Sequence, residues 1–319
     1  MTLQQTIKSF VPLTKLALRA QLRENELGLL CPCGIGDTYF ACALAAEISR
    51  ANNNLPIVAV VKQNHRDIPQ LFPDSIARIV TYQSRQIVNS VAWSRNLAPG
   101  KLFFAHPSVK LAGNSCDLDI IGYKKLNLLD LYKFAFQLDI AAPLSSPKVP
   151  EDNIDAARQR INDYGLPLGQ TVILAPDSNT TPNFSDLKAY DFWQLLSQQL
   201  LDCGYTVVAL TNKSRDFLPQ IPRVDFPLIE AIPFAEMCGW VIASRSGLCD
   251  LLATAKTKLT ILYPDCPWYS GTVYSCSSLS LMGLSKSVTE IAIPDSSPAQ
   301  ETIEQITASN GVAKEVIYE

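Results

Sequence analysis

Histidines and long apolar runs are scarce in this chain of 319 residues. Its two histidines, His65 and His106, are too few for a histidine-rich metal site and disfavour a nucleophilic triad. No apolar run reaches the roughly 20 residues that span a bilayer. The N-terminal region also lacks the uninterrupted apolar core of a cleavable signal peptide. These absences predict a cytoplasmic protein.

Excess charge and regular cysteine spacing are missing as well. The net charge is −3 and the pI is about 5.5, so nucleic acid is not expected as a partner. The nine cysteines do not follow the spacing of a disulfide scaffold, which indicates reduced thiols. Apolar residues make up 47% of the chain, and its length suits two globular domains.

The segment 6–25 mixes apolar residues such as Leu16 and Leu18 with basic residues such as Lys15 and Arg19. Pro12 divides it, so one long helix is not expected. Two interpretations stay open. The segment packs on its own domain, or it forms a basic amphipathic helix on the inner face of the membrane.

The first half of the chain has the order of a parallel α/β domain. A buried strand over 26–33 precedes a glycine turn, a helix from about Thr38 to Arg50 and a strand over 56–62. Two short strands and a helix over 126–140 follow. The proline- and serine-rich stretch 141–153 predicts a linker, with a domain boundary near Pro150.

The second half repeats this order. Strands are expected at 170–178, 205–212, 241–246 and 258–265, separated by helices, and a last helix at 297–311. We therefore predict two Rossmann-like doubly wound domains facing a cleft, 1–150 and 151–319. The interpretation also allows the last helix to pack back on the first domain.

The loop between the first strand and helix reads Cys-Pro-Cys-Gly-Ile-Gly-Asp-Thr. Its glycines Gly34 and Gly36 allow close approach to a ligand, and the N–H groups of the following helix suit anionic oxygens. A dinucleotide fingerprint is disfavoured, because Tyr39 replaces its third glycine and Lys62 ends the second strand. Asp37 alone fits either a catalytic carboxylate or an ordinary N-terminal helix residue.

Three segments taken in order over residues 26–268 resemble the ADP-heptose:lipopolysaccharide heptosyltransferases, which are family 9-like glycosyltransferases of the GT-B fold. They are the Gly-Ile-Gly-Asp-Thr loop, the stretch 172–212 and the stretch 234–267. The resemblance implies inverting, metal-independent transfer without a cofactor. It also implies that Asp37 is the general base, in a loop formed by Gly34, Ile35, Gly36 and Thr38.

The resemblance further implies a site for the donor's pyrophosphate in the second domain. Its residues are Ser246, Gly247, Leu248 and Cys249, together with Ser178, Asn179, Thr180 and the nearest cation, Lys188. The chain departs from the family pattern at four places. Arg245 stands in place of an acid, Asp250 in place of a histidine, Ser185 in place of a lysine, and Asp177 in place of a glycine. Arg245 could supply the missing positive charge, because a guanidinium binds phosphate oxygens bidentately.

Other residue patterns are weaker. His106 ends an expected strand and either lines the acceptor side or caps a turn. Asp117 and Asp119 have the spacing of a metal-binding pair that belongs to a different transferase fold. Cys31 and Cys33 are expected to be core thiols beside the loop.

The expected function is transfer of a sugar from an ADP-, UDP- or GDP-linked donor to a surface glycan. The acceptor would be a glycan or lipid-linked glycan of lipopolysaccharide, capsule or glycoprotein. The alternative is a non-catalytic subunit of a glycan assembly system that binds nucleotide sugar or glycan. The missing cations favour this alternative, and the Gly-Ile-Gly-Asp loop favours the enzyme.

Overall fold

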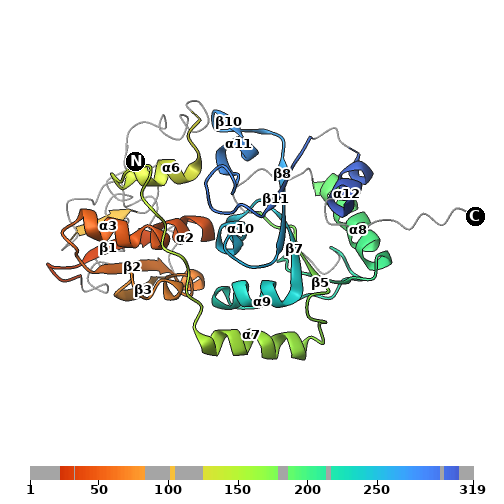
Figure 1. Cartoon of the computed structure of the whole chain (residues 1–319), viewed down its shortest axis with the longest axis horizontal. Helices are drawn as coiled ribbons and strands as arrows, with labels where there is room; N and C mark the ends of the chain where they lie inside the picture. The colour runs from red at the N-terminus through yellow and green to blue at the C-terminus, as the bar shows by residue number, and fades with distance from the viewer. Residues whose placement is uncertain are drawn as a thin grey trace, which may run out of the picture. The chain divides into compact units, whose positions relative to one another are not determined.

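The computed structural model describes residues 22–31, 33–82, 101–104, 125–178, 186–212, 217–294 and 298–308, with the backbone alone at 101–104 and 186–190 (Figure 1). The chain forms two compact units. One comprises Met1–Pro150, Pro227–Ile229 and Tyr269–Gly271, and the other Glu151–Phe226, Glu230–Trp268 and Thr272–Glu319. The predicted segment 6–21 lies outside the described residues. None of the described helices is long and apolar enough to cross a membrane.

The first unit contains a parallel sheet in the order β3-β2-β1-β4. Its strands are β1 (Leu27–Cys31), β2 (Ile57–Lys62), β3 (Arg78–Tyr82) and β4 (Lys101–Phe104). β1 is buried along its whole length, and β2 is buried except at Lys62. Such continuous apolar runs are typical of strands that are covered on both faces.

The helices of the first unit are α2 (Ile35–Ala43), α3 (Ala45–Ala51) and α6 (Leu128–Ala135), with 3₁₀ turns at Gln63–His65 and Pro69–Leu71. The expected helix from Thr38 to Arg50 begins three residues earlier and is divided at Leu44. The expected helix over 126–140 is shorter, because Gln137 has a positive φ of 60° that α-helical backbone does not adopt.

The second unit contains a parallel sheet in the order β11-β8-β7-β5-β6. Its strands are β5 (Thr171–Ala175), β6 (Thr206–Ala209), β7 (Gly239–Ser244), β8 (Lys258–Pro264) and β11 (Thr289–Ile293). A separate two-stranded sheet pairs β9 (Pro267–Trp268) with β10 (Gly271–Thr272). The predicted α/β class with parallel sheets is confirmed. The cleft between two domains stays a prediction.

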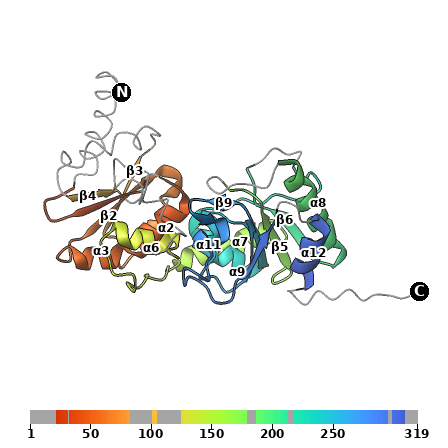
Figure 2. The same cartoon turned by 90° about the horizontal axis from the view of Figure 1, so that it is seen from above.

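Helices cover both faces of the second sheet. They are α7 (Glu151–Asp163), α8 (Asp186–Asp202), α9 (Ala231–Cys238), α10 (Gly247–Leu252), α11 (Val273–Ser277) and α12 (Ala299–Ala308). A 3₁₀ turn at Leu228–Glu230 precedes α9. Figure 2 shows α7 and α9 on one side of this sheet and α8 and α12 on the other. Ile303 and Ile306 of α12 join the core formed with Trp193 and Leu196, so the last helix is part of this unit.

The predicted linker over 141–153 is wrong at its end. Glu151 begins the 13-residue helix α7 directly after Pro150. A proline before a helix and the acidic residues Glu151 and Asp152 in its first turn are helix-starting signals. Composition alone had assigned these residues to the linker.

Gly239 joins α9 to β7 in a conformation that favours glycine. Its φ is 101°, and a Cβ there would come within 2.9 Å of the Cα of Gly169. The contact brings the loop before β5 against the start of β7, so it limits the distance between the first residues of these two neighbouring strands.

The cysteines of the described residues are all free thiols. Five of them are buried, namely Cys31, Cys42, Cys238, Cys249 and Cys276. Burial raises the pKa of the Cys238 thiol to about 12, and it raises the pKa of Cys42 further. Cys42 and Cys238 are therefore protonated core groups at neutral pH.

Candidate active site

Each sheet has a point where the strand order reverses. In the first unit the chain moves from β1 to β2 and β3, and then returns to β4 on the other side of β1. In the second unit it moves from β5 to β6, and then to β7 on the other side of β5. Ligands of open α/β sheets bind at the carboxyl ends of strands at such reversals. Asp37 follows β1, and Arg245 follows β7, so both sequence motifs lie at these points.

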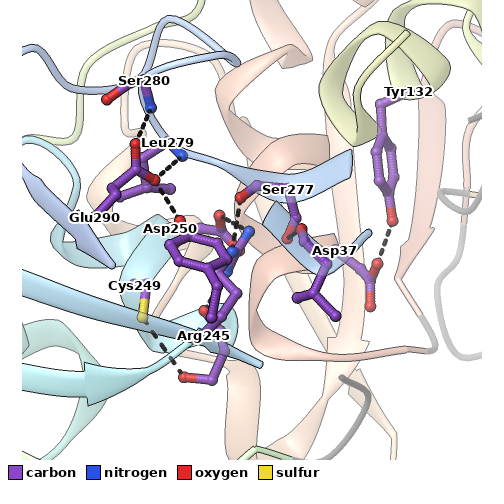
Figure 3. A network of polar contacts seen from close by, with 12 residues as sticks. Asp37, Tyr132, Arg245, Cys249, Asp250, Ser277, Leu279, Ser280 and Glu290 are labelled. Carbon is purple, nitrogen blue, oxygen red and sulfur yellow. Dashed lines mark hydrogen bonds and ion pairs between the residues drawn. The ribbon is translucent and has the colours of Figure 1, made fainter. Parts of the chain in front are cut away.

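The carboxylate of Asp37 is held on both oxygens, and Figure 3 shows the contact with Tyr132. Its Oδ2 accepts a hydrogen bond from the Gly34 backbone N–H at 2.5 Å. Its Oδ1 accepts one from the hydroxyl of Tyr132 on α6. The side chain of Asp37 is half-buried, whereas Tyr132 is 0% exposed. Each carboxylate oxygen has a second lone pair, so Asp37 can still accept a proton.

Glycine occupies position 34 because the carboxylate of Asp37 lies close by, and not because the backbone there is unusual. Its φ of −86° and ψ of −177° are ordinary extended values that any residue adopts. A Cβ at this position would come within 3.1 Å of Asp37 Oδ2. The group that closely approaches the Gly34 backbone in the structure is therefore the side chain of Asp37.

Two side chains anchor the loop before α2. The Nζ atom of Lys62, at the end of β2, donates to the carbonyl oxygen of Cys33 at 2.6 Å. The hydroxyl of Tyr82, at the end of β3, donates to the carbonyl oxygen of Cys31 at 3.0 Å. Lys62 thus holds the loop from the position at which a dinucleotide-binding domain has an acid.

Thr38 connects the loop to a buried histidine. Its hydroxyl donates to the Gly34 carbonyl oxygen at 3.0 Å and lies 3.1 Å from Nδ1 of His65. His65 is 5% exposed. Burial, aided by the charge of Lys62 and opposed by that of Asp37, lowers its pKa to about 4. The imidazole is therefore neutral at pH 7.

In the second unit, Arg245 is engaged inside the protein. It is 3% exposed and forms a bidentate ion pair with Asp250, which is 2% exposed. The Nη2–Oδ1 distance is 2.7 Å and the Nη1–Oδ2 distance is 3.2 Å. Burial opposes the positive charge, but Asp250 outweighs it and raises the pKa of Arg245. The positive charge of Arg245, which the sequence suggested for binding the diphosphate, is thus neutralised by Asp250.

Arg245 also donates to two backbone carbonyl oxygens, at 2.5 Å to Ser246 and 2.8 Å to Ser277. The loop residues Ser246, Gly247 and Leu248 are half-buried, while Cys249 and Asp250 are buried. Within the predicted donor loop, surface for a ligand is therefore offered by Ser246–Leu248. The buried residues Arg245, Cys249 and Asp250 support that segment from the protein interior.

Glu290, which is half-buried, makes a second set of contacts with the residues that follow Ser277. Glu290 of β11 accepts hydrogen bonds from the backbone N–H groups of Leu279 and Ser280 at 2.8 and 3.2 Å (Figure 3). It also accepts one from the Ser278 hydroxyl at 2.8 Å. The hydroxyl of Tyr263 donates to it as well. Burial raises the pKa of Glu290, but these hydrogen bonds outweigh burial and lower it overall. Glu290 therefore fixes the turn whose first carbonyl binds Arg245.

Asp177, the other acid that departs from the family pattern, is satisfied within its own unit. Its carboxylate accepts from the Thr211 hydroxyl at 3.0 Å and from the Asn212 N–H at 2.7 Å. Ser178 beside it is half-buried. The carboxylate thus joins the loops that follow β5 and β6.

Several sequence-predicted residues lie outside what the structure describes. These are Asn179, Thr180, Ser185, His106, Asp117 and Asp119, and only the backbone of Lys188 is described.

Burial, with the nearby charge of Asp37, raises the pKa of the Cys33 thiol to about 12 although Lys62 opposes it. Across the described ranges, no group of three or more potential metal ligands comes together.

Tyr132 and Glu290 were missed by sequence reasoning. Tyr132 lies 95 residues from Asp37, within a helix whose pattern indicates only core packing. Glu290 lies in a short strand, TEIAI, that the motif analysis did not include. No local signal marks either residue.

Comparison of the two parallel α/β units with solved structures shows which class of protein has this fold. The chain has the fold of the bacterial heptosyltransferases and of a family 9 glycosyltransferase. E. coli ADP-heptose lps heptosyltransferase II matches with a TM-score of 0.60 and 14% identity, over 89% of this chain and 98% of that one.

Two further structures agree. The family 9 glycosyl transferase of Veillonella parvula matches with a TM-score of 0.56 and 14% identity, over 91% and 93% of the two chains. E. coli heptosyltransferase WaaC with ADP matches with a TM-score of 0.56 and 11% identity, over 89% and 99%. No family model and no curated protein matches the sequence. The resemblance seen in the sequence is thus confirmed as a likeness of fold.

Proposed function

We propose that the protein is an inverting glycosyltransferase that moves a sugar from a nucleotide-sugar donor to a glycan or lipid-linked glycan acceptor. One observation carries the proposal. Asp37 lies at the strand-order reversal of the first unit, with its carboxylate held by Gly34 and Tyr132. The fold shared with known glycosyltransferases supports it.

In the proposed reaction, Asp37 acts as general base. It takes the proton of the acceptor hydroxyl while that oxygen forms a bond to the anomeric carbon of the donor sugar. The bond from the anomeric carbon to the phosphate oxygen breaks, and its electron pair leaves with the nucleoside diphosphate. Lone pairs of the carboxylate that Gly34 and Tyr132 do not use are the proton acceptors.

The donor is assigned to the second unit, at the carboxyl ends of β5 and β7. The half-buried residues Ser178, Ser246, Gly247 and Leu248 lie there. We propose that backbone and hydroxyl groups of these residues bind the diphosphate, and that Lys188 of α8, Asn179 and Thr180 contribute as well. Arg245 and Asp250 then support the site and do not touch the phosphate, because they bind each other.

The donor class is the first quantity to measure. Among the solved structures similar to this chain, WaaC is bound to ADP in one and to ADP-2-deoxy-2-fluoro heptose in another. We therefore propose an ADP-linked sugar as the first candidate, followed by UDP- and GDP-linked sugars. A ligand that binds only the native state raises its melting temperature. Thermal shift with ADP, UDP, GDP and CMP should show stabilisation by one of them.

The matching nucleotide sugar is then incubated with a glycolipid extract, and release of the nucleoside diphosphate is followed. Release that depends on the extract and is lost in Asp37→Asn supports the transferase. The ion pair of Arg245 with Asp250 favours a second candidate, a subunit that binds nucleotide sugar without turnover, because it leaves the described loop without an exposed guanidinium. Tight nucleotide binding without release in any extract would favour that candidate.

A further inference from the structure

We propose that Tyr132 is the positioning residue for Asp37, and that it sets the direction from which the carboxylate takes the acceptor's proton. The inference rests on the proposed function and extends it to a residue outside the sequence motif. Tyr132 lies on α6, which packs against α2, and its hydroxyl donates to Oδ1 of Asp37 (Figure 3).

The two hydrogen bonds of Asp37 come from groups that cannot readily move. The Gly34 N–H belongs to the backbone at the start of α2. The Tyr132 ring is fully buried and packs against Phe40, with ring centroids 5.3 Å apart, and against Phe136 at 6.4 Å. With one oxygen held by each group, rotation about the Cβ–Cγ bond is blocked, so the remaining lone pairs have fixed directions.

Tyr132 stays a donor throughout the reaction. Burial, together with the charge and the hydrogen bond of Asp37, raises the pKa of its hydroxyl well above the usual value. The proton taken from the acceptor therefore resides on Asp37, and Tyr132 keeps its own. A tyrosine with this function acts on the orientation of the base and makes no contact with substrate.

The expected kinetics follow from these two roles, in which Asp37 takes the proton and Tyr132 orients Asp37. Tyr132→Phe keeps the ring packing and removes the hydroxyl, so the chain should fold and bind donor with a KM within about twofold of wild type. The value of kcat should fall about 10-fold or more, because a freely rotating carboxylate is seldom aligned with the acceptor hydroxyl. The effect should vanish in the Asp37→Asn background, since a residue that acts through Asp37 has nothing left to orient.

Tyr82→Phe is the matched control. It removes another buried tyrosine hydroxyl from the same unit, one that donates to the Cys31 carbonyl and not to Asp37. Its cost should appear in the melting temperature, and its kcat should fall less than that of Tyr132→Phe. An equal fall of kcat in both variants would mean that the Tyr132 hydroxyl only supports the loop before α2, as that of Tyr82 does, which would overturn the inference.

The contact itself is tested without turnover by fluorine NMR of the full chain carrying fluorotyrosine at its 11 tyrosines. The signal absent from Tyr132→Phe identifies Tyr132, and it should shift in Asp37→Asn, whereas the signal of Tyr82 should shift less. An unmoved Tyr132 signal, or full kcat in Tyr132→Phe while Asp37→Asn is inactive, would overturn the inference alone. Full activity of Asp37→Asn, or no turnover with ADP-, UDP- or GDP-linked sugars, would instead overturn the proposed function and the inference with it.

Discussion

Arg245 and Asp250 form a bidentate ion pair with both side chains 3% exposed. The pair ties the two ends of the strand-turn-helix segment over 244–252 together, because Arg245 begins the turn after β7 and Asp250 lies within α10. Removal of one partner from a buried ion pair destabilises a protein, because the other charge is left buried without a counter-charge. The pair therefore determines the shape of the loop that the sequence assigned to the donor.

Removing one partner of this pair should destabilise the second unit. Arg245→Ala leaves Asp250 buried without a counter-charge, which costs about 3–5 kcal/mol of unfolding free energy. The double variant Arg245→Met with Asp250→Leu should lose less, since no buried charge is left. Urea unfolding measures both. If Arg245→Ala is as stable as wild type yet binds nucleotide more weakly, Arg245 faces the phosphate after all, as the sequence suggested.

Replacing Asp37 should abolish turnover without abolishing donor binding. Asp37→Asn retains an acceptor oxygen but cannot take a proton, so kcat should fall about 100-fold or more. Asp130→Asn is the matched control, because Asp130 also accepts from the N–H of its N-cap residue, Asn127, at 3.2 Å. Both variants lose a helix-capping charge, and the control should stay within about twofold of wild type. Equal losses of kcat would mean that Asp37 is only a capping residue.

Glu290→Gln should loosen the turn at residues 278–280. An amide offers one acceptor oxygen where the carboxylate offers two, so buried donors lose partners at a cost of about 1–3 kcal/mol. Because the native state lowers the pKa of Glu290, its contribution is present at neutral pH and is lost as pH falls through the acid range. Glu304→Gln, at an exposed site past the first turn of α12, is the control and should unfold like wild type. A Glu290→Gln midpoint equal to that of the control would exclude the support role.

His65 should make stability depend on pH between about 6.5 and about 4. Its pKa is lowered from 6.5 to about 4 in the folded chain, so the unfolded state binds the proton first as pH falls. Stability is therefore complete above pH 6.5 and decreases toward pH 4. His65→Asn should remove this part of the dependence, and His106→Asn measures what the other histidine contributes. Parallel urea midpoints for wild type and His65→Asn across this range would contradict the buried neutral imidazole.

The strands were predictable because buried parallel strands leave a strong local pattern. Segments such as Leu27–Cys31 and Thr171–Ala175 are short apolar runs bounded by loop residues. The start of α7 was less predictable, since Glu151 and Asp152 suit both a polar linker and a first helical turn. The position of Asp37 after β1 followed from the glycine loop alone.

The partners of the site residues could not be predicted in the same way. Tyr132 meets Asp37 across 95 residues, and the packing of α6 on α2 decides that contact. For Arg245 and Asp250, the sequence contains both charges but not their directions. Whether they face a ligand or each other depends on the turn between β7 and α10, which no pattern of residue types specifies.

Because several thiols are buried, chemical labelling of cysteines can measure unfolding. Alkylating reagents react with thiolates, and burial keeps Cys31, Cys42, Cys238 and Cys249 protonated and covered in the folded chain. Each of these cysteines becomes reactive only when its surroundings open. Cys31 and Cys42 belong to the first unit, and Cys238 and Cys249 to the second. Peptide-resolved alkylation therefore yields a separate opening rate for each half from one unmodified sample.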